Sequence, residues 1–389
     1  MSKPNQADRG TKFATKLVQF EAAPKDPFRP MVTPIYQTVT FEQEQADSFG
    51  EYDYSRSGNP TRKVLEDQMA ALENGVRGFC FSSGVTAIAT VTHLLSYGDE
   101  ILADYDLYGG AIRLFAKVLN RSGVTVRYID ASDPETVSAA MRPATRLVYV
   151  ESPTNPSLRV LDLAAIAAVA KQHGALFCVD GTVMSPYLQN PLDLGADIVM
   201  HSATKYLCGH SDVTAGVLVA KDAAVAERIY FLQNAEGTAL GPFDSYLLLR
   251  GLKTLKLRMD TAQGSAHAIA EYLQAHPKVK QVYYPGLPSH ANHVVQLRQA
   301  RGSGALLSFT VGSGEAAKRL AETLELFNIS LSFGGLKSAI SIPVKMSHSS
   351  VPEEMRAARA IPEDLLRLAI GIEDTDDLLQ DLRRGLDAL

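Results

Sequence analysis

Hydrophobic and polar positions alternate in two regular patterns between about residues 58 and 250. Short runs of apolar, often β-branched residues predict buried strands, and stretches with apolar residues three and four positions apart predict helices between them. The predicted strands cover 78–81, 100–103, 125–129, 146–150, 175–179, 197–201 and 216–220, and the predicted helices start after Asn59 or cover 85–95, 111–119 and 163–171. Buried strands that alternate with helices are typical of a mostly parallel sheet covered by helices on both faces.

The pattern changes on either side of this region. After residue 250 it predicts one long helix from near Gly251 to near His276, and then a smaller set of strands (280–284, 306–311, 329–333 and 367–370) and helices (315–327 and 376–389). Residues 1–57 lack periodicity and contain several prolines, which predicts an extended arm. We therefore expect an arm at 1–57, an α/β domain with a seven-stranded sheet at 58–250, and a smaller α+β domain at 251–389.

Composition narrows the class of protein. The 389 residues are 46% hydrophobic and 21% charged, which is typical of a globular chain. The formal net charge of −5 argues against a nucleic-acid partner, and the sequence has no apolar run long enough to span a membrane. The three cysteines lie far apart and predict reduced thiols and a cytoplasmic location. We expect no metal site, because His201, Cys208 and His210 fit no common ligand spacing.

Polar residues follow most of the predicted strands of the larger domain. They are the Ser-Ser-Gly turn at 82–84, Tyr108 with two glycines after it, the segment 151–156, Asp180, and the segment 201–205 that ends in Lys205. Each alone is typical of a turn, a helix cap or a solvated lysine. Ligands bind at the carboxyl ends of strands in open α/β sheets, so these groups are expected to share one edge. An anion-binding turn, a carboxylate, hydroxyls, a lysine and an aromatic ring together indicate a pyridoxal phosphate site.

The same segments carry a family resemblance that extends over nearly the whole chain. The sequence resembles the Cys/Met-metabolism group of pyridoxal-phosphate enzymes. The motifs are YSRSGNPT (54–61), SSG (82–84), DLYGG (106–110), ESPTNP (151–156), VD (179–180), HSATKY (201–206), and two further segments at 241–253 and 366–374, while segments at 346–352 and 358–367 resemble the plant-type branch of the family. The resemblance implies the fold type I transferase-like architecture, with the large sheet sandwiched by helices and a smaller C-terminal α+β domain.

The resemblance also implies a role for each matching residue. Lys205, which binds the cofactor covalently, and Tyr108, which stacks on its ring, are the implied catalytic residues. The other implied cofactor contacts are Asp180 at the ring nitrogen, Asn155 at the ring oxygen, and, at the phosphate, the backbone of Gly84 and Val85, the hydroxyls of Ser202 and Thr204, and Tyr54 and Arg56 from a neighbouring subunit. The implied substrate contacts are Tyr54, Asn155, Ser332 and Arg367.

Within the family the resemblance is greatest to the plant-type β-eliminating branch. It implies a small amino-acid substrate, α,β-elimination of cystathionine to homocysteine, pyruvate and ammonia, and a homo-oligomer built as a dimer of dimers. Many γ-acting members carry Glu near Lys337, where the plant-type branch has Lys-Ser. The alternatives are γ-lyase, γ-synthase and O-acylhomoserine sulfhydrylase activities, or a non-catalytic regulator that binds the cofactor. A Rossmann dehydrogenase ranks lower, because no GxGxxG follows the first strand.

Overall fold

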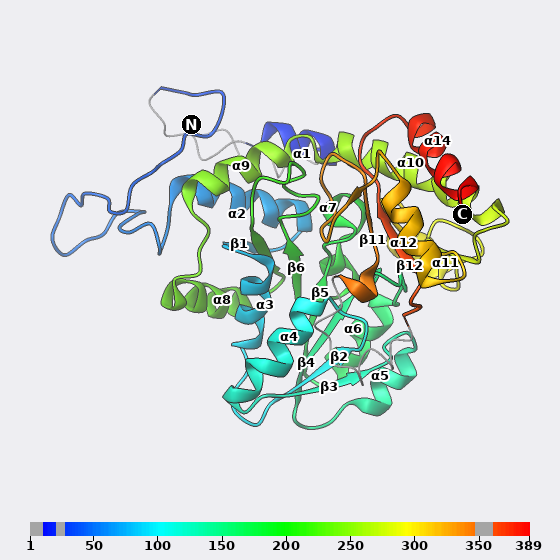
Figure 1. Cartoon of the computed structure of the whole chain (residues 1–389). Helices are drawn as coiled ribbons and strands as arrows, with labels where there is room; N and C mark the ends of the chain where they lie inside the picture. Colours follow the sequence, from blue (N-terminus) through cyan, green and yellow to red (C-terminus); the bar gives the residue numbers. More distant parts are fainter. Residues whose placement is uncertain (1–10, 21–27, 347–360) are drawn as a thin grey trace.

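A seven-stranded sheet forms the centre of the larger domain in the computed structural model, which describes residues 11–20, 28–346 and 361–389 (Figure 1). The strand order is β1-β7-β6-β5-β4-β2-β3. The strands are β1 (Arg77–Phe81), β2 (Glu100–Asp104), β3 (Thr125–Ile129), β4 (Thr145–Glu151), β5 (Leu176–Asp180), β6 (Ile198–Ser202) and β7 (Gly216–Ala220). Only β7 runs antiparallel to its neighbours, so the predicted mostly parallel sheet is confirmed.

Helices cover both faces of this sheet, and alternate residues along each strand face one layer or the other. Val179 of β5 packs into one core and Cys178 into the other, as the two-residue period of a strand requires. The helices of the larger domain are α2 (Pro60–Glu73), α3 (Gly84–Thr92), α4 (Gly109–Lys117), α5 (Pro134–Ala140), α6 (Leu163–Gln172), α7 (Ser185–Leu188) and α8 (Ala223–Glu236). Short 3-10 turns lie at Leu119–Ser122 and Pro191–Leu194. Residues of α3, α4 and α8 form the core on one face, and those of α2 and α6 belong to the core on the other.

The start of α2 shows why the first predicted helix forms where it does. Asn59 has extended backbone, and its side-chain oxygen accepts hydrogen bonds from the amides of Thr61 and Arg62. Pro60 occupies the first helical position, where its missing N–H costs nothing. The predicted cap is therefore confirmed.

A five-stranded sheet of order β10-β11-β12-β9-β8 forms the smaller domain. Its strands are β8 (Gln281–Tyr283), β9 (Leu306–Thr310), β10 (Asn328–Ile329), β11 (Ala339–Ser341) and β12 (Leu365–Ala369), with α11 (His293–Gln299), α12 (Gly314–Thr323), a 3-10 turn (Pro343–Lys345) and α14 (Thr375–Asp387). The sequence did not predict β11. The strand expected at 329–333 is wrong beyond Ile329, because the backbone oxygen of Ser332 accepts from Arg367 instead of joining a strand ladder.

The long helix expected from near Gly251 to near His276 is confirmed, but it starts at Leu255, and a separate helix that the sequence did not predict precedes it. The chain forms α9 (Pro242–Leu252) and α10 (Leu255–Ala275), separated at Thr254. The carbonyl oxygen of Gly251 accepts hydrogen bonds from the side chains of Thr254 and Arg258. The backbone amide of Thr254 also donates to this oxygen, at 3.2 Å, so α9 ends in a tight turn whose contacts helical periodicity does not report. The expected domain boundary at residue 250 falls inside α9.

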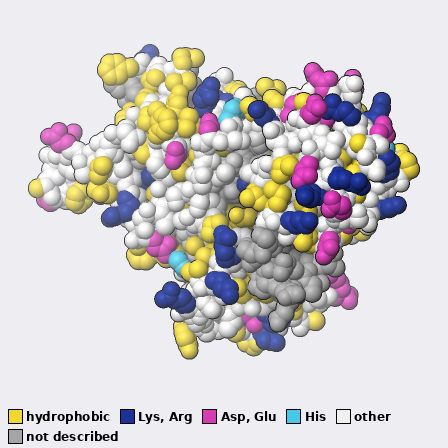
Figure 2. All heavy atoms as spheres, viewed as in Figure 1, with side chains coloured by type: hydrophobic (Ala, Val, Ile, Leu, Met, Phe, Trp, Pro, Cys, Tyr) yellow, Lys and Arg dark blue, Asp and Glu magenta, His cyan; other side chains and the backbone are white. Residues whose placement is uncertain are grey.

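The N-terminal arm contains one helix that the sequence did not predict, α1 (Phe13–Gln19). Leu17 of α1 is buried, and the side chain of Gln68 donates to the carbonyl oxygen of Leu17 at 3.0 Å. Residues 28–57, by contrast, project from the body of the chain (Figure 1). Hydrophobic side chains gather on this projection (Figure 2), with Phe28, Met31, Val32, Val39 and Phe49 all more than half exposed. No helix in the described part of the chain is long and apolar enough to cross a membrane.

The packing of α2 on the sheet depends on the absence of a side chain at Gly78 of β1. A Cβ atom there would lie 2.3 Å from the backbone oxygen of Glu66. We expect Gly78→Ala to lower the free energy of unfolding by about 1–3 kcal/mol, because α2 must move away from the sheet. Gly264→Ala is the control: Gly264 is an exposed position of α10 with no atom near its missing Cβ, and the change should stabilise by about 0.5–1 kcal/mol. Thermal unfolding of both variants measures this; equal shifts in one direction would contradict it.

Candidate active site

Most predicted site residues lie at one edge of the large sheet, where the parallel strands end. β1 ends beside β7 at Phe81 opposite Gly216, and Gly216 also pairs with Ser202 at the end of β6. Glu151 at the end of β4 pairs with Asp180 at the end of β5. The predicted residues brought to this edge are Gly84, Val85, Tyr108, Asn155, Asp180, Ser202, Thr204 and Lys205.

The start of α3 forms a small cradle beside β6. Ser83 caps the helix, and its hydroxyl accepts a hydrogen bond from the amide of Thr86 at 3.1 Å. The amides of Gly84 and Val85 lie in the first turn, where a helix supplies no acceptor of its own. A Cβ atom at Gly84 would lie 2.9 Å from the Cβ of Ser202, so glycine lets α3 approach β6 this closely. The cradle fits a phosphate group.

Thr204 has a second task near this cradle. Its hydroxyl donates to the backbone oxygen of Ala215 at 3.2 Å and accepts from the amide of Ala215 at 2.9 Å. The side chain thus ties the segment around Lys205 to the start of β7. The phosphate contact expected for Thr204 stays a prediction.

Asp180 is a buried carboxylate that has no cationic side chain as an ion-pair partner among the described residues. One of its oxygens accepts a hydrogen bond from the amide of Thr182 at 2.9 Å. Burial raises the pKa of this carboxyl group, and the hydrogen bonds from Thr182 oppose that rise. A cationic group of a ligand would stabilise the ionised form of Asp180.

Lys205 lies between the two domains. Its Nζ donates a hydrogen bond to the hydroxyl of Ser332 at 2.7 Å and lies 5.1 Å from the centre of the Phe333 ring. Burial, with a smaller effect of the nearby Arg367 guanidinium, lowers the pKa of the Lys205 amine to about 8. A substantial part of this amine is therefore neutral, and nucleophilic, near neutral to mildly alkaline pH.

Arg367 of β12 is 1% exposed and has no carboxylate partner among the described residues. Its guanidinium donates to the side-chain oxygen of Asn155 at 3.2 Å and to the backbone oxygen of Ser332 at 3.0 Å. Its Nε has no hydrogen-bond acceptor in the same part of the chain. Burial lowers the pKa of this group to about 10. A buried guanidinium without an anion is a site for the carboxylate of a ligand.

Tyr108 is the residue that precedes α4, and it is 41% exposed. A Cβ atom at Gly110 would lie 2.3 Å from the Tyr108 ring, so the second glycine of the motif leaves room for this ring position. The backbone amide of Tyr108 donates to Glu151 at 3.0 Å. The sequence pattern places Glu151 at a strand end but indicates no role for it.

Tyr54 and Arg56 are the predicted residues that the structure of one chain does not bring to the site. Both are exposed on the arm, and the Arg56 guanidinium lies 5.2 Å from the centre of the Tyr54 ring. Arg56 donates to Asn234 of α8 at 3.3 Å. Part of the motif segments at 346–352 and 358–367 lies outside the described residues.

The histidines and cysteine considered for a metal bond to different partners. His201 contacts Glu73 of α2 at 2.6 Å, the Cys208 thiol donates to Asp212 at 3.0 Å, and the His210 ring contacts the backbone oxygen of Cys208 at 2.8 Å. His201 and Glu73 are both fully buried, so this pair anchors α2 to the sheet. The sequence gave no signal for the pair, because the two residues are far apart along the chain.

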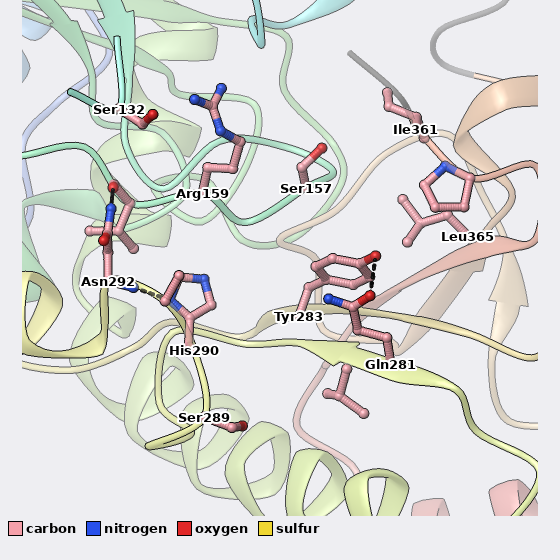
Figure 3. Close-up of a pocket in the computed structure, with 14 residues that line it drawn as sticks. Ser132, Ser157, Arg159, Gln281, Tyr283, Ser289, His290, Asn292, Ile361 and Leu365 are labelled. Carbon is pink, nitrogen blue, oxygen red and sulfur yellow. Dashed lines mark hydrogen bonds between the residues drawn. The ribbon is translucent and has the colours of Figure 1, made fainter. Parts of the chain in front are cut away.

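A separate cavity of about 540 Å³ lies between β8, the segment 157–160 and the start of β12 (Figure 3). None of the predicted site residues lines it. Its polar side chains bond within the protein: His290 to the backbone oxygen of Leu158, Asn292 to that of Val160, and Arg159 to Asp104. The cavity is therefore distinct from the site at the sheet edge.

Pyridoxal phosphate fits the residues at the sheet edge. Its phosphate would match the cradle at Gly84, its ring nitrogen would give Asp180 a cationic partner, and its aldehyde would react with the Lys205 amine. Arg367 remains for the carboxylate of an amino-acid substrate. The fit rests on two buried groups of opposite charge, Asp180 and Arg367, neither of which forms an ion pair with another described residue.

Comparison with known proteins agrees with this fit. Residues 14–387 match the family model for Cys/Met metabolism PLP-dependent enzymes. The chain is 52% identical over 357 residues to chloroplastic cystathionine beta-lyase of Arabidopsis thaliana, covering 92% of this chain and 77% of the relative. It is 46% identical to cystathionine gamma-lyase of Bacillus subtilis, covering 91% of this chain and 93% of the relative.

Solved structures agree as well. The solved structure of cystathionine gamma-lyase from Lactobacillus plantarum, complexed with L-serine, matches this chain with a TM-score of 0.94 and 44% sequence identity. The match covers 97% of this chain and 99% of that one. The match therefore includes both sheets and the connections between them. With its site residues and its sequence in agreement, the chain belongs to the Cys/Met metabolism family of pyridoxal-phosphate-dependent enzymes.

Proposed function

We propose that this enzyme is a carbon–sulfur lyase that breaks cystathionine between sulfur and the β carbon, giving homocysteine, pyruvate and ammonia. The observation that carries the proposal is the buried, anion-free guanidinium of Arg367, linked through Ser332 to the Lys205 amine. This arrangement holds the carboxylate of an amino acid next to a base. The names of the relatives from Arabidopsis thaliana and Mimosa pudica support β-elimination.

The residues divide the work by their chemistry. When bound, pyridoxal phosphate supplies a ring that accepts the electron pair left at Cα. Asp180 keeps the ring nitrogen protonated, and Arg367 with Asn155 holds the substrate carboxylate. The neutral amine of Lys205 removes the Cα proton. Lys205 or Tyr108 then donates a proton to the sulfur that leaves, and water hydrolyses the remaining three-carbon fragment.

We expect Lys205→Ala to lose the reducible covalent link to pyridoxal phosphate and at least about 100-fold in turnover, because it removes a general base. In the unaltered protein, covalent attachment should become faster as pH rises through the Lys205 pKa of about 8, since only the neutral amine reacts. Borohydride reduction followed by peptide mass analysis identifies the attached lysine. Attachment at another lysine, or full turnover by the variant, would refute this assignment.

Asp180→Asn should lower turnover by about 100-fold, because the ring nitrogen loses the anion that keeps it protonated. Substrate binding should change little, since Arg367 and Asn155 are untouched. Stopped-flow absorbance with cystathionine separates the two effects: it measures substrate binding and the proton-removal step independently. Near-normal proton removal in this variant would contradict the role of Asp180.

The products distinguish β-elimination from its nearest alternative. β-elimination of cystathionine yields pyruvate and homocysteine, whereas γ-elimination yields 2-oxobutyrate and cysteine. The gamma-lyase names of the relatives from Bacillus subtilis and Lactobacillus plantarum favour γ-elimination as the second candidate. We expect pyruvate as the main product, and chromatography of the derivatised oxo acids measures the ratio.

We also propose that the active unit is a dimer, paired further into a tetramer, in which the arm of one subunit completes the site of another. In a single chain Tyr54 and Arg56 are exposed and contact the arm or α8 rather than the cradle. A second copy of the chain would cover the exposed apolar side chains of the arm. Arg56 would then supply a bidentate cation for the phosphate.

The expected cytoplasmic location remains a further prediction.

Subunit mixing tests the shared site. Arg56→Ala and Lys205→Ala proteins should each be inactive alone. After partial unfolding and joint reassembly, a mixed dimer holds one site with both Lys205 and Arg56 intact, so about a quarter of the sites should recover. If mixed dimers form without recovery, Arg56 serves its own subunit.

A further inference from the structure

Glu151 connects two site loops through their main chains. It is the last residue of β4, and it is 4% exposed. One carboxylate oxygen accepts a hydrogen bond from the backbone amide of Tyr108 at 3.0 Å. The other accepts from the backbone amide of Asn155 at 2.9 Å. One side chain therefore fixes the start of α4 and the loop after β4 relative to each other.

The backbone positions of Tyr108 and Asn155 determine where the side chains of these two residues start. Tyr108 follows β2, and Asn155 follows the neighbouring strand β4. The large sheet fixes the strands, but its ladder ends before either residue. Glu151 extends the connection past the end of the ladder, to the backbone amide of Tyr108 on one side and the backbone amide of Asn155 on the other.

The connection continues into the smaller domain. The side-chain oxygen of Asn155 accepts from Arg367, Arg367 donates to the backbone oxygen of Ser332, and the Ser332 hydroxyl accepts from Lys205. A displacement of the Asn155 backbone therefore changes the position of the group that meets the substrate carboxylate. Glu151 itself does not have to touch the substrate for this effect.

We propose that Glu151 is a positioning residue. By holding the two backbone amides, its carboxylate sets the Tyr108 ring and the Asn155 side chain at the correct separation for the cofactor and the substrate. The inference rests on the proposed roles of Tyr108 and Asn155. A carboxylate suits this task because both of its oxygens accept hydrogen bonds. In Glu151→Gln, only one oxygen remains, and the side-chain NH2 group faces the second amide donor.

The structure also tells which amide should lose its partner. The hydrogen bond from the backbone amide of Asn155 to Glu151 is buried, whereas the one from the backbone amide of Tyr108 is only partly buried, and Tyr108 as a residue is 41% exposed. An unsatisfied donor costs more when it is buried, so the oxygen of Gln should turn to Asn155 and release the Tyr108 amide. Hydrogen exchange measured by mass spectrometry on the cofactor-free protein should be about tenfold faster in the peptide that contains Tyr108. The peptide that contains Asn155 should change less.

Asp381→Asn is a control in the smaller domain. Asp381 is a buried carboxylate that also accepts from two backbone amides, those of Glu325 and Leu326, and it forms an additional ion pair with Arg384. Both variants should lose stability. Only Glu151→Gln should weaken the affinity of the cofactor-free protein for pyridoxal phosphate, by about tenfold, and change the visible circular dichroism of the bound cofactor. With cystathionine, only Glu151→Gln should lower kcat and raise KM.

The outcomes separate this inference from the proposed function. A loss of stability in Glu151→Gln with exchange, cofactor affinity and circular dichroism all unchanged overturns the positioning role. Equal effects of the control on cofactor affinity overturn it too. If the unaltered enzyme does not cleave cystathionine, the proposed function fails, while the exchange and cofactor measurements still decide the role of Glu151. If Glu151→Gln does not fold, Glu151→Asp, which keeps the charge but shortens the reach, replaces it in the same measurements.

Discussion

Two buried charges of opposite sign, Asp180 and Arg367, form the constraint on which the rest of the site depends. A buried ion without a partner destabilises a fold, because it has lost water and gained nothing in exchange. Each of these charges keeps some hydrogen bonds, from Thr182 to Asp180 and from Arg367 to Asn155 and Ser332. A ligand that carries both a cationic nitrogen and a carboxylate would give each of these two groups a partner of opposite charge.

The two domains divide this task between them. Asp180 comes from the large sheet, whose parallel strand ends form a ready ligand edge. Arg367 comes from β12 of the smaller sheet and crosses to Asn155 of the larger domain. Lys205 and Ser332 make a second contact across the same boundary. The reacting centre therefore lies where the two units meet, and its dimensions depend on how they pack.

The sequence predicted the larger domain and its strand-end residues well. Asp180 directly follows a buried apolar run, and Lys205 lies in the short segment after another, so local pattern alone predicts both at one edge. Ser332 and Arg367 could be assigned only through family resemblance, because no local pattern brings β12 to Lys205. The sequence pattern indicated the cradle residue Gly84 only in part. Its Ser-Ser-Gly turn is common in proteins, and its close approach to Ser202 depends on tertiary packing.

The misses have physical reasons of the same kind. The break between α9 and α10 depends on Arg258, whose side chain reaches back to Gly251. Helix α8 escaped prediction because its buried residues include Gln233 as well as Val225 and Ile229, which blurs the apolar stripe. Strand β11 has three residues and is recognised only by its neighbours. Local propensity yields to tertiary contacts at each of these places.

The bonds from Glu151 have a consequence for how this family can change over time. They hold main-chain amides, a group that every residue except proline possesses. Evolution can therefore exchange the side chains at positions 108 and 155 without releasing the backbone that carries them. A substitution at either position therefore changes the side chain presented to the site while the main chain that carries it stays in place.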